Sequence, residues 1–173
     1  LVYLGLGEQD IKDMRQTLLS CTVESKSKIE QLEDYYKSIG AEKRFNYIKN
    51  IIENNNVLNE IKTALNQRKD SGDLNNNGII RMVEGYFTEL AFVYAEIYRT
   101  CMPGSKVAFV NDNVRYGGEV IPVDFLSSLF AEQLGFKIKK VYCLHQKKGN
   151  SSQQMAKFGK VSLRKSITVW EKE

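Results

Sequence analysis

The sequence predicts an α/β domain in its second half, because helical and strand patterns alternate there. A long helical pattern covers Ile80–Cys101, and a short run rich in β-branched and aromatic residues follows it at Lys106–Val110. The alternation continues with a helix over Pro122–Leu134 and strands over Phe136–Leu144 and Leu163–Trp170. Helices that alternate with strands in this way are typical of layered α/β domains.

The helices of this half are predicted from residue spacing and from the residues at their ends. Ile80–Cys101 carries apolar residues at helical spacing, which we interpret as a core face rather than a cofactor site. They are Val83, Tyr86, Phe87, Leu90, Val93, Tyr94, Ile97, Tyr98 and Cys101. Pro103 and Gly104 end this helix. Pro122 suits the first position of the next helix, and Gly135 suits its C-terminal cap.

The order of the strands predicts where their loops meet. A strand–helix–strand unit makes Lys106–Val110, which we expect to be buried, parallel to Phe136–Leu144 through a right-handed crossover. The strand is expected to stop at Asn111, and the loops over 111–121 and 146–162 then leave the same edge of the sheet. Leu163–Trp170 returns from that edge, so it is predicted to run antiparallel to its neighbours. Ligands gather at such loop clusters in α/β folds.

The first part of the chain is predicted to form a helical lobe. Helices are predicted over Ile11–Leu19, Lys28–Ile39, Glu42–Glu53 and Val57–Leu65, and the polar stretch 68–78 as a mobile connection. We therefore divide the chain into a helical lobe at residues 1–78 and an α/β part at residues 79–173. A structural cap without chemistry of its own is the favoured interpretation of the lobe.

The composition restricts the class of protein. With 173 residues and 42% hydrophobic residues, the chain can form one core. No apolar run approaches the roughly 20 residues that span a bilayer. Cys21, Cys101 and Cys143 are far apart, which predicts reduced, mostly buried cysteines in a cytoplasmic protein. His145 is the single histidine, which argues against a zinc site, and we interpret it as a strand-end residue rather than a catalyst.

Positive charge is concentrated at the end of the chain. From residue 137 onward the only acids are Glu171 and Glu173. The basic residues there are Lys137, Lys139, Lys140, Lys147, Lys148, Lys157, Lys160, Arg164, Lys165 and Lys172. This pattern is typical either of a surface for a polyanion or of a merely solvated lysine face, and charge alone does not distinguish them.

Three runs resemble a known family. They are RMVEGYFTELAFVYAEIYRTCMPGSKVAFVNDNVRYGGEVIPVDF, GNSSQQMAKFGKVSLRKSITVW and, near the start, RQTLLSCTV. They are similar to the S-adenosylmethionine-dependent DNA modification methylases that act on an exocyclic amine, adenine N6 or cytosine N4. The resemblance implies a partial Rossmann-like methyltransferase sheet, made of its last three strands in mixed orientation, with an N-terminal helical lobe. It also implies that the last strand, Leu163–Trp170, inserts between the other two.

Two motifs of that family are absent from the sequence. One is a Phe-x-Gly-x-Gly cofactor loop, and the other is a catalytic Asp/Asn/Ser-Pro-Pro-Tyr tetrapeptide, whereas Pro103 and Pro122 are the only prolines here. The resemblance therefore implies a carboxyl-terminal part, with the missing motifs before Leu1. S-adenosylmethionine is expected to bind the parent enzyme. This chain alone is expected to bind no cofactor and to contain no catalytic residue. Expected partners are DNA and the missing half, or a second copy through the open edge of Lys106–Val110.

The resemblance also implies which residues face DNA. Candidates for the pocket of a flipped base are Asn111, Asp112, Asn113, Arg115, Tyr116 and Phe158. Candidates for DNA contact are Lys147, Lys148, Asn150, Ser151, Ser152, Gln153, Gln154, Lys157, Lys160 and Arg164. Strand termination and loop hydrogen bonding are the alternative for residues 111–116, and packing under its own hairpin is the alternative for Phe158.

A second hypothesis of another class stays open. The chain could be a non-catalytic nucleic-acid-binding or interaction module whose helical lobe contacts a partner. Cofactor binding discriminates between the two, because a working methyltransferase needs it and a binding module does not.

Overall fold

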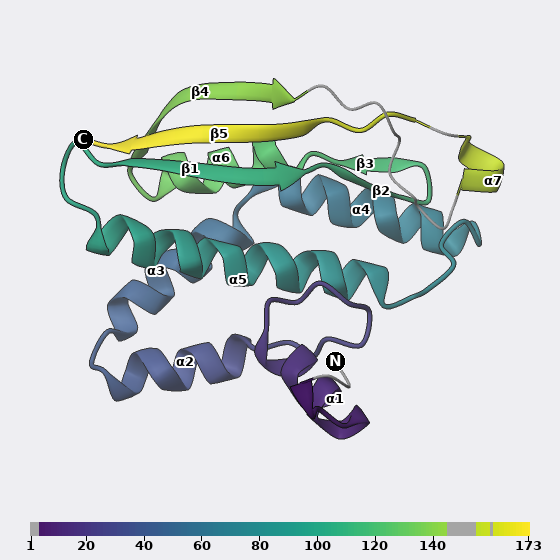
Figure 1. Ribbon diagram of the computed structural model, residues 1–173, viewed down its shortest axis with the longest axis horizontal. Coiled ribbons are helices and arrows are strands. Elements are labelled where there is room, and N and C mark those ends of the chain that lie inside the picture. The colour runs from purple at the N-terminus through teal and green to yellow at the C-terminus, as the bar shows by residue number, and fades with distance from the viewer. Residues whose placement is uncertain (1–3, 145–154, 160) are drawn as a thin grey trace.

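In the computed structural model, a small sheet lies on a layer of helices (Figure 1). The structure describes residues 4–144, 155–159 and 161–173. The helices are α1 (Glu8–Thr17), α2 (Ile29–Ser38), α3 (Glu42–Glu53), α4 (Asn56–Asp70), α5 (Ile79–Thr100), α6 (Val123–Gln133) and α7 (Met155–Phe158). The strands are β1 (Lys106–Asp112), β2 (Val114–Tyr116), β3 (Glu119–Ile121), β4 (Phe136–Leu144) and β5 (Lys165–Lys172). An α/β chain is therefore confirmed.

The predicted position of the last strand is confirmed. The three-stranded sheet has the order β1-β5-β4, and β5 pairs antiparallel with both neighbours, from Lys106 opposite Glu171 on one side to Phe136 opposite Lys172 on the other. β1 and β4 therefore run in the same direction, as predicted. Because β5 separates β1 from β4, every hydrogen-bonded pair in this sheet is antiparallel, and the expectation of a mixed sheet is wrong.

Helices cover one face of this sheet and build the core there. Trp170, fully buried on β5, packs edge-on against Tyr94 of α5 with ring centroids 4.9 Å apart, and it stacks with Phe109 at 5.7 Å. Phe136 of β4 lies 5.8 Å from the same ring. Aromatic pairs at these separations add favourable contact energy to their burial. The interpretation of the α5 stripe as core is thus confirmed for Phe87 and Tyr94, whereas Val93 is 42% exposed.

The opposite face of the sheet is open among the described residues. Ala108 and Val110 point to that face opposite Val169 and Ile167, and Val110 is 55% exposed. Side chains alternate between the faces of a strand, so a sheet covered on one side buries only every second residue. The expectation of a buried strand at Lys106–Val110 is therefore wrong: β1 is an edge strand with an alternating burial pattern.

The helical lobe packs on α5 and shares its core. Phe45 of α3 stacks on Phe92 of α5 at 5.4 Å, and Leu65 of α4 is fully buried in the same cluster. One hydrophobic cluster therefore extends across residue 78, and the division into two units there stays a prediction.

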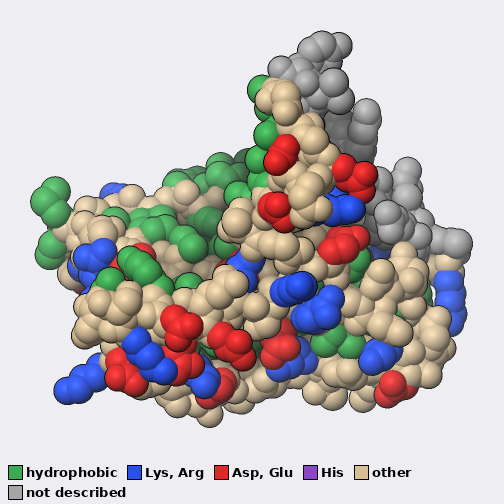
Figure 2. Space-filling view, turned by 90° about the horizontal axis from the view of Figure 1, so that it is seen from below, with side chains coloured by type: hydrophobic (Ala, Val, Ile, Leu, Met, Phe, Trp, Pro, Cys, Tyr) green, Lys and Arg blue, Asp and Glu red, His purple; other side chains and the backbone are tan. Residues whose placement is uncertain are grey.

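The N-terminal end of the lobe leaves an apolar surface. α1 buries none of its residues, and Leu18, after its last turn, is 57% exposed. Leu18, Tyr35 and Val93 help to line a groove of about 660 Å³ between α2 and α5. Figure 2 shows hydrophobic side chains gathered in a hollow on this side of the molecule.

Two predicted boundaries are wrong because local hydrogen bonding continues the elements. α4 does not end at Leu65 but reaches Asp70, so the predicted mobile connection begins as helix. β1 continues through Asn111 and Asp112, which pair with Ser166 and Lys165. The predicted loop over residues 111–121 contains the β2–β3 hairpin, which turns at Gly117 and Gly118 with positive φ.

Two predictions from composition can also be compared with the fold. Within the described ranges, no helix has the length and apolarity needed to cross a bilayer. The three cysteines are free, but Cys21 and Cys143 are exposed and Cys101 is half-buried, so the expectation of mostly buried cysteines is wrong.

Candidate functional site at the end of strand β1

A cavity lies where β1 ends, between the first half of α5, the β2–β3 hairpin and the segment that precedes α2. Its volume is about 250 Å³. Its lining is mostly apolar and aromatic, with a few polar groups. The residues are Ser20, Cys21, Met82, Val83, Tyr86, Phe87, Asp112, Val114, Tyr116, Ile121 and Val123. A small apolar pocket with a few polar groups at a strand's carboxyl end is the default location for a ligand.

Two tyrosines give the cavity its aromatic walls. Burial raises the pKa of both Tyr86 and Tyr116, and the nearby Cys21 adds to each shift. A raised phenol pKa means that both hydroxyls keep their protons at neutral pH and can donate hydrogen bonds. The walls thus offer flat ring surfaces and neutral donors, which suits a planar heteroaromatic ring.

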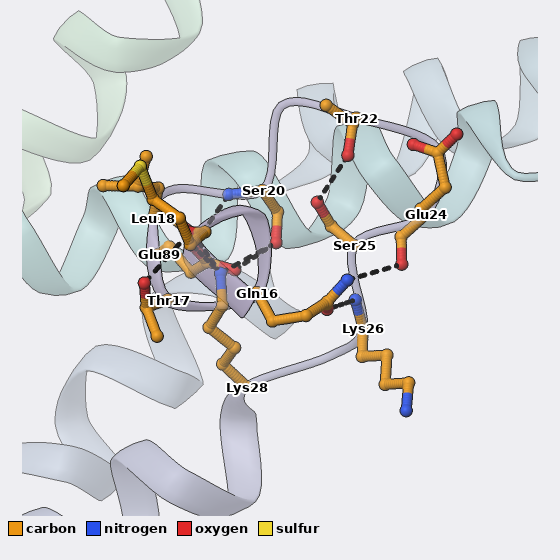
Figure 3. Close-up of polar contacts among 11 residues, drawn as sticks. Gln16, Thr17, Leu18, Ser20, Thr22, Glu24, Ser25, Lys26, Lys28 and Glu89 are labelled. Carbon is orange, nitrogen blue, oxygen red and sulfur yellow. Dashed lines mark hydrogen bonds and ion pairs between the residues drawn. The ribbon is translucent and has the colours of Figure 1, made fainter. Parts of the chain in front are cut away.

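The segment between α1 and α2, residues 18–28, forms the opposite wall and is fastened to α5 (Figure 3). The Ser20 backbone N–H donates to Glu89 Oε2 at 2.9 Å, and the Ser20 hydroxyl donates to Glu89 Oε1. Lys28 Nζ lies 3.0 Å from Glu89 Oε2, and only about a tenth of either side chain is exposed. Gln16, reaching from α1, bonds the backbone of Glu24 and Lys26.

Beside the cavity, a buried polar network joins β1, α6 and β5. Asp124 is 1% exposed, and its Oδ2 accepts hydrogen bonds from Arg164 Nε at 2.6 Å and Ser166 Oγ at 2.8 Å. Burial alone would raise the pKa of Asp124, but these hydrogen bonds hold it below its usual value. Asn113 Oδ1 accepts from the Asp124 backbone N–H at 3.3 Å, which satisfies one free donor at the start of α6.

Asn111 belongs to the same network. Ser166 Oγ lies 3.4 Å from Asn111 Oδ1, while Asn111 Nδ2 has no partner among the described residues. Asp112, the next residue, pairs with Lys165 at 3.5 Å.

The β2–β3 hairpin is bonded to residues 158 and 159, which lie in the basic segment 146–162. Arg115, which is 8% exposed, donates to the backbone oxygens of Phe158, at 3.3 Å, and of Gly159. The Phe158 ring packs on Gly118: a Cβ added there would lie 2.7 Å from that ring. The guanidinium of Arg68 lies 5.6 Å from the Phe158 ring centre, and its side chain bonds Glu119 at 2.7 Å.

The chain has relatives among proteins of known function. It is 60% identical over 172 residues to the Type II methyltransferase M.BsoBI of Geobacillus stearothermophilus. The aligned residues make up 99% of this chain and 34% of M.BsoBI. The chain is 42% identical over the same length to the Type II methyltransferases M.AvaI of Nostoc and of Anabaena variabilis, where it covers 33% of each. Its relatives are Type II methyltransferases.

The resemblance to modification methylases is confirmed at this level. The chain spans about one third of the length of these methyltransferases. No protein-family model matches the sequence. No solved structure matches it either.

The structure separates the candidates for the methyltransferase's base pocket into three groups. Asp112 and Tyr116 line the cavity. Asn111 and Asn113 lie in the Asp124 network instead. Arg115 donates to the Phe158 backbone oxygen, and the half-buried Phe158 packs on the β2–β3 hairpin rather than under its own hairpin.

The candidates for DNA contact lie partly outside the described residues. Those outside are Lys147, Lys148, Asn150, Ser151, Ser152, Gln153, Gln154 and Lys160. Lys157 is described and pairs with Asp73, although 70% of its side chain is exposed. Arg164 pairs with Asp124 and is 47% exposed. Both described cations therefore have an acidic partner within the chain.

Sequence reasoning missed four residues of this region: Ser20, Tyr86, Glu89 and Asp124. Tyr86 was assigned to the core because helical spacing does not reveal that a cavity adjoins the helix. Ser20 lies in the run RQTLLSCTV, which carried the resemblance, and that run was the available signal. Glu89 and Asp124 became visible only when their partners, 69 and 40 residues away in sequence, were brought to them.

The cavity at the end of β1 is not a complete cofactor site. A cavity of about 250 Å³ is smaller than the roughly 300–1,000 Å³ of pockets that enclose a drug-sized ligand, so it suits a single base rather than S-adenosylmethionine. No glycine-rich turn with converging backbone amides adjoins it in the described part of the chain. Among those residues there is also no cluster of three or more metal-ligating side chains.

Proposed function

We propose that this chain is the carboxyl-terminal part of an S-adenosylmethionine-dependent DNA methyltransferase that methylates an exocyclic amine of a flipped base. The observation that carries the proposal is the 60% identity to M.BsoBI over 99% of the chain. The cavity at the end of β1 supports it independently, because its position and its lining suit a nucleobase. A Rossmann-like parent sheet, of which β1, β5 and β4 are the last three strands, forms part of the proposal.

The cavity is the place for the flipped base in this proposal. A base in a duplex must leave the stack before an enzyme can reach its amine, and flipping enzymes hold it by stacking and by hydrogen bonds to its edge. Tyr86 and Tyr116 supply ring surfaces and donors. Asp112 supplies a carboxylate on another wall, whereas Ser20 shapes the opposite wall with its hydroxyl bonded to Glu89. Holding the base in one orientation is this chain's contribution to the reaction, since alignment supplies much of the catalysis in a transfer between two bound groups.

In this proposal, the catalytic and cofactor-binding groups belong to the rest of the methyltransferase, outside these 173 residues. The sequence lacks a Phe-x-Gly-x-Gly loop and a Pro-Pro-Tyr motif, and the cavity is too small for the cofactor. The relatives are about three times as long as the matched region. The proposal therefore gives this chain no catalytic residue and assigns those groups to the remainder of the enzyme.

DNA contact is assigned to the basic segment 146–162 and to the strand ends beside it. Lysines neutralise phosphates without regard to sequence, so they position the enzyme on DNA rather than select a site. Lys147, Lys148 and Lys160 carry this role in the proposal. Lys157 and Arg164 contribute less, because Asp73 and Asp124 already compensate their charges.

A methyl-transfer assay tests the proposal. Tritiated S-adenosylmethionine and mixed-sequence DNA are incubated with the 173-residue chain, with the complementary two thirds of M.BsoBI, and with both together. We expect label in DNA only when both are present, and no heat of cofactor binding to the chain alone. Label incorporated by the chain alone would contradict the assignment of the catalytic groups to other polypeptide. DNA binding by the chain without methyl transfer even when both polypeptides are present would favour the non-catalytic binding module.

A further inference from the structure

The segment of residues 18–28 lies along α5 on a surface shaped to receive it. Gly78 and Gly85 are seven residues apart and Glu89 follows four residues later, so all three fall on one face of the helix. That face is about 16 Å long, at a rise of 1.5 Å per residue. The segment therefore contacts α5 over several turns rather than at one point.

Each of the three positions has a specific partner in the segment. A Cβ at Gly85 would lie 3.2 Å from Ser20 Cβ and 3.3 Å from Ser20 Oγ. A Cβ at Gly78 would lie 2.9 Å from the Val23 backbone oxygen, which also accepts a hydrogen bond from Arg81 at 2.9 Å. The absence of side chains at the two glycines thus lets the segment come close enough for Glu89 to bond Ser20.

Glu89 is the polar anchor of this contact. Its carboxylate accepts from the Ser20 backbone N–H, from the Ser20 hydroxyl and from Lys28 Nζ (Figure 3). Ser20 is 1% exposed and Glu89 is 8% exposed, so water does not compete for these bonds. A buried carboxylate needs a cation and hydrogen-bond donors, and the segment supplies both. This use of Glu89 accounts for a buried charge that the proposed function leaves unexplained.

The contact decides the shape of the cavity. Ser20 and Cys21 line it from the side opposite the β2–β3 hairpin, whereas α1, which precedes them, buries no residue. Arg81 and Gln16 fasten the later part of the segment, at Val23, Glu24 and Lys26, whereas Glu89 accepts the hydrogen bonds that Ser20 itself donates. We propose that Glu89, assisted by Gly85, is a positioning residue that holds Ser20–Cys21 as one wall of the base-binding cavity. The identity of the ligand, a nucleobase of DNA, rests on the proposed function. The attachment of the segment to α5 does not depend on it.

The experiment uses the 173-residue chain and two readouts. The first is hydrogen exchange of a peptide that covers residues 18–28. The second is the rate at which maleimide modifies Cys21, followed by peptide mass spectrometry with and without a saturating single-stranded oligonucleotide, whose binding is verified by anisotropy. Cys101, free and half-buried at the C-terminal end of α5, is the internal reference. Glu89→Gln is compared with Glu84→Gln, a matched control on the same helix whose partner is Lys62.

In the unsubstituted chain we expect the oligonucleotide to slow modification of Cys21 severalfold and to leave Cys101 unchanged. In Glu89→Gln, exchange of residues 18–28 should rise by about tenfold, as expected when local opening becomes easier, and the protection of Cys21 should disappear. Glu84→Gln should behave like the unsubstituted chain in both readouts. Exchange and protection that are unchanged in Glu89→Gln would overturn the positioning role.

A second variant covers the case in which Glu89→Gln does not fold. Gly85→Ala introduces the Cβ that meets Ser20, and it should loosen the segment without removing a charge. Adding Ser20→Gly removes the opposing Cβ but keeps the backbone N–H that bonds Glu89, so it should restore part of the protection of Cys21, a rescue that a general loss of stability would not produce; Ser20→Gly alone is the control for the lost hydroxyl bond. Failure of this rescue would overturn the steric part of the inference. A bound oligonucleotide that leaves Cys21 unprotected in the unsubstituted chain would instead overturn the proposed base-binding cavity, even with the exchange results as expected.

Discussion

Asp124 and Arg164 form an ion pair that joins the first turn of α6 to the residue before β5. Arg164 Nε lies 2.6 Å from Asp124 Oδ2, and the carboxylate is 1% exposed while the guanidinium is 47% exposed. Ser166 and the backbone N–H of Phe125 complete the carboxylate's hydrogen bonds. The pair joins the sheet to α6 beside the cavity. Arg164, which was expected to contact DNA, therefore has a structural role as the partner of Asp124.

The pair predicts a pH-dependent stability. Asp124→Asn should lower the free energy of unfolding at pH 7 by about 1.5–3 kcal/mol, the range for hydrogen bonds to a charged group, rather than more, because Arg164 remains half-solvated. The pKa of Asp124 is lowered in the folded chain, so its contribution is present above the unfolded pKa of about 3.9 and is lost as pH falls through the folded value.

Urea unfolding followed by the fluorescence of Trp170, the single tryptophan, measures this difference. The gap between the two proteins should be constant from pH 7 to about pH 5 and should shrink below about pH 4. Asp34→Asn, at a position on α2 away from this network, is the control. A gap that widens on acidification would contradict the assignment.

Because Phe158 packs on the hairpin, the effects on stability of substitutions at Gly118 and at Phe158 should depend on each other. Gly118→Ala and Gly104→Ala both place a side chain at positive φ, 86° and 82°, which costs about 1–2 kcal/mol. Only Gly118 has a neighbour at that position, the Phe158 ring, because nothing lies within 4 Å of a Cβ at Gly104. Gly118→Ala should therefore cost more than Gly104→Ala in unfolding experiments. In a Phe158→Ala background the two costs should become equal; if the excess persists, Phe158 is not its cause.

The salt dependence of DNA binding tests the basic segment. Changing Lys147, Lys148, Lys157 and Lys160 together to Ala should flatten the slope of log affinity against log salt, by about 0.9 for each phosphate that the lysines no longer neutralise. Lys157→Ala alone should change the slope little, since Asp73 already compensates that charge. Lys43→Ala, on the exposed side of α3, should leave it unchanged. If the fourfold variant keeps the original slope, the lysines are merely solvated.

Stacking in the cavity predicts a difference between two substitutions at one tyrosine. Tyr116→Ala should weaken binding of single-stranded DNA by about 1–3 kcal/mol, the cost of removing one base-stacking surface. Tyr116→Phe keeps the ring and should retain most of the affinity. Single-stranded DNA is used because its bases enter a pocket without the cost of leaving a duplex. Tyr35→Ala, at a position 57% exposed on α2, should have no effect, and an equal loss there would point to a non-specific aromatic contribution.

Local patterns determined much of the architecture. The central position of β5 followed from the resemblance to the methylases. The apolar spacing of α5, the proline and glycines around α6, and the order of the elements led to the helices and to the antiparallel direction of β5. These features depend on side-chain periodicity and on chain connectivity, both of which are written in neighbouring residues. Resemblance in the runs around residues 81–125 and 149–170 led to the methyltransferases.

Tertiary structure alone decided what the polar residues do. Asn111 and Asn113 end beside Asp124, and Arg115 meets Phe158, although all were expected together in one pocket. The cavity wall comes from Ser20 and Cys21, held by Glu89 from 69 residues away. A buried polar group must find partners wherever the fold brings them, and a pattern of nearest neighbours contains no record of contacts between distant segments.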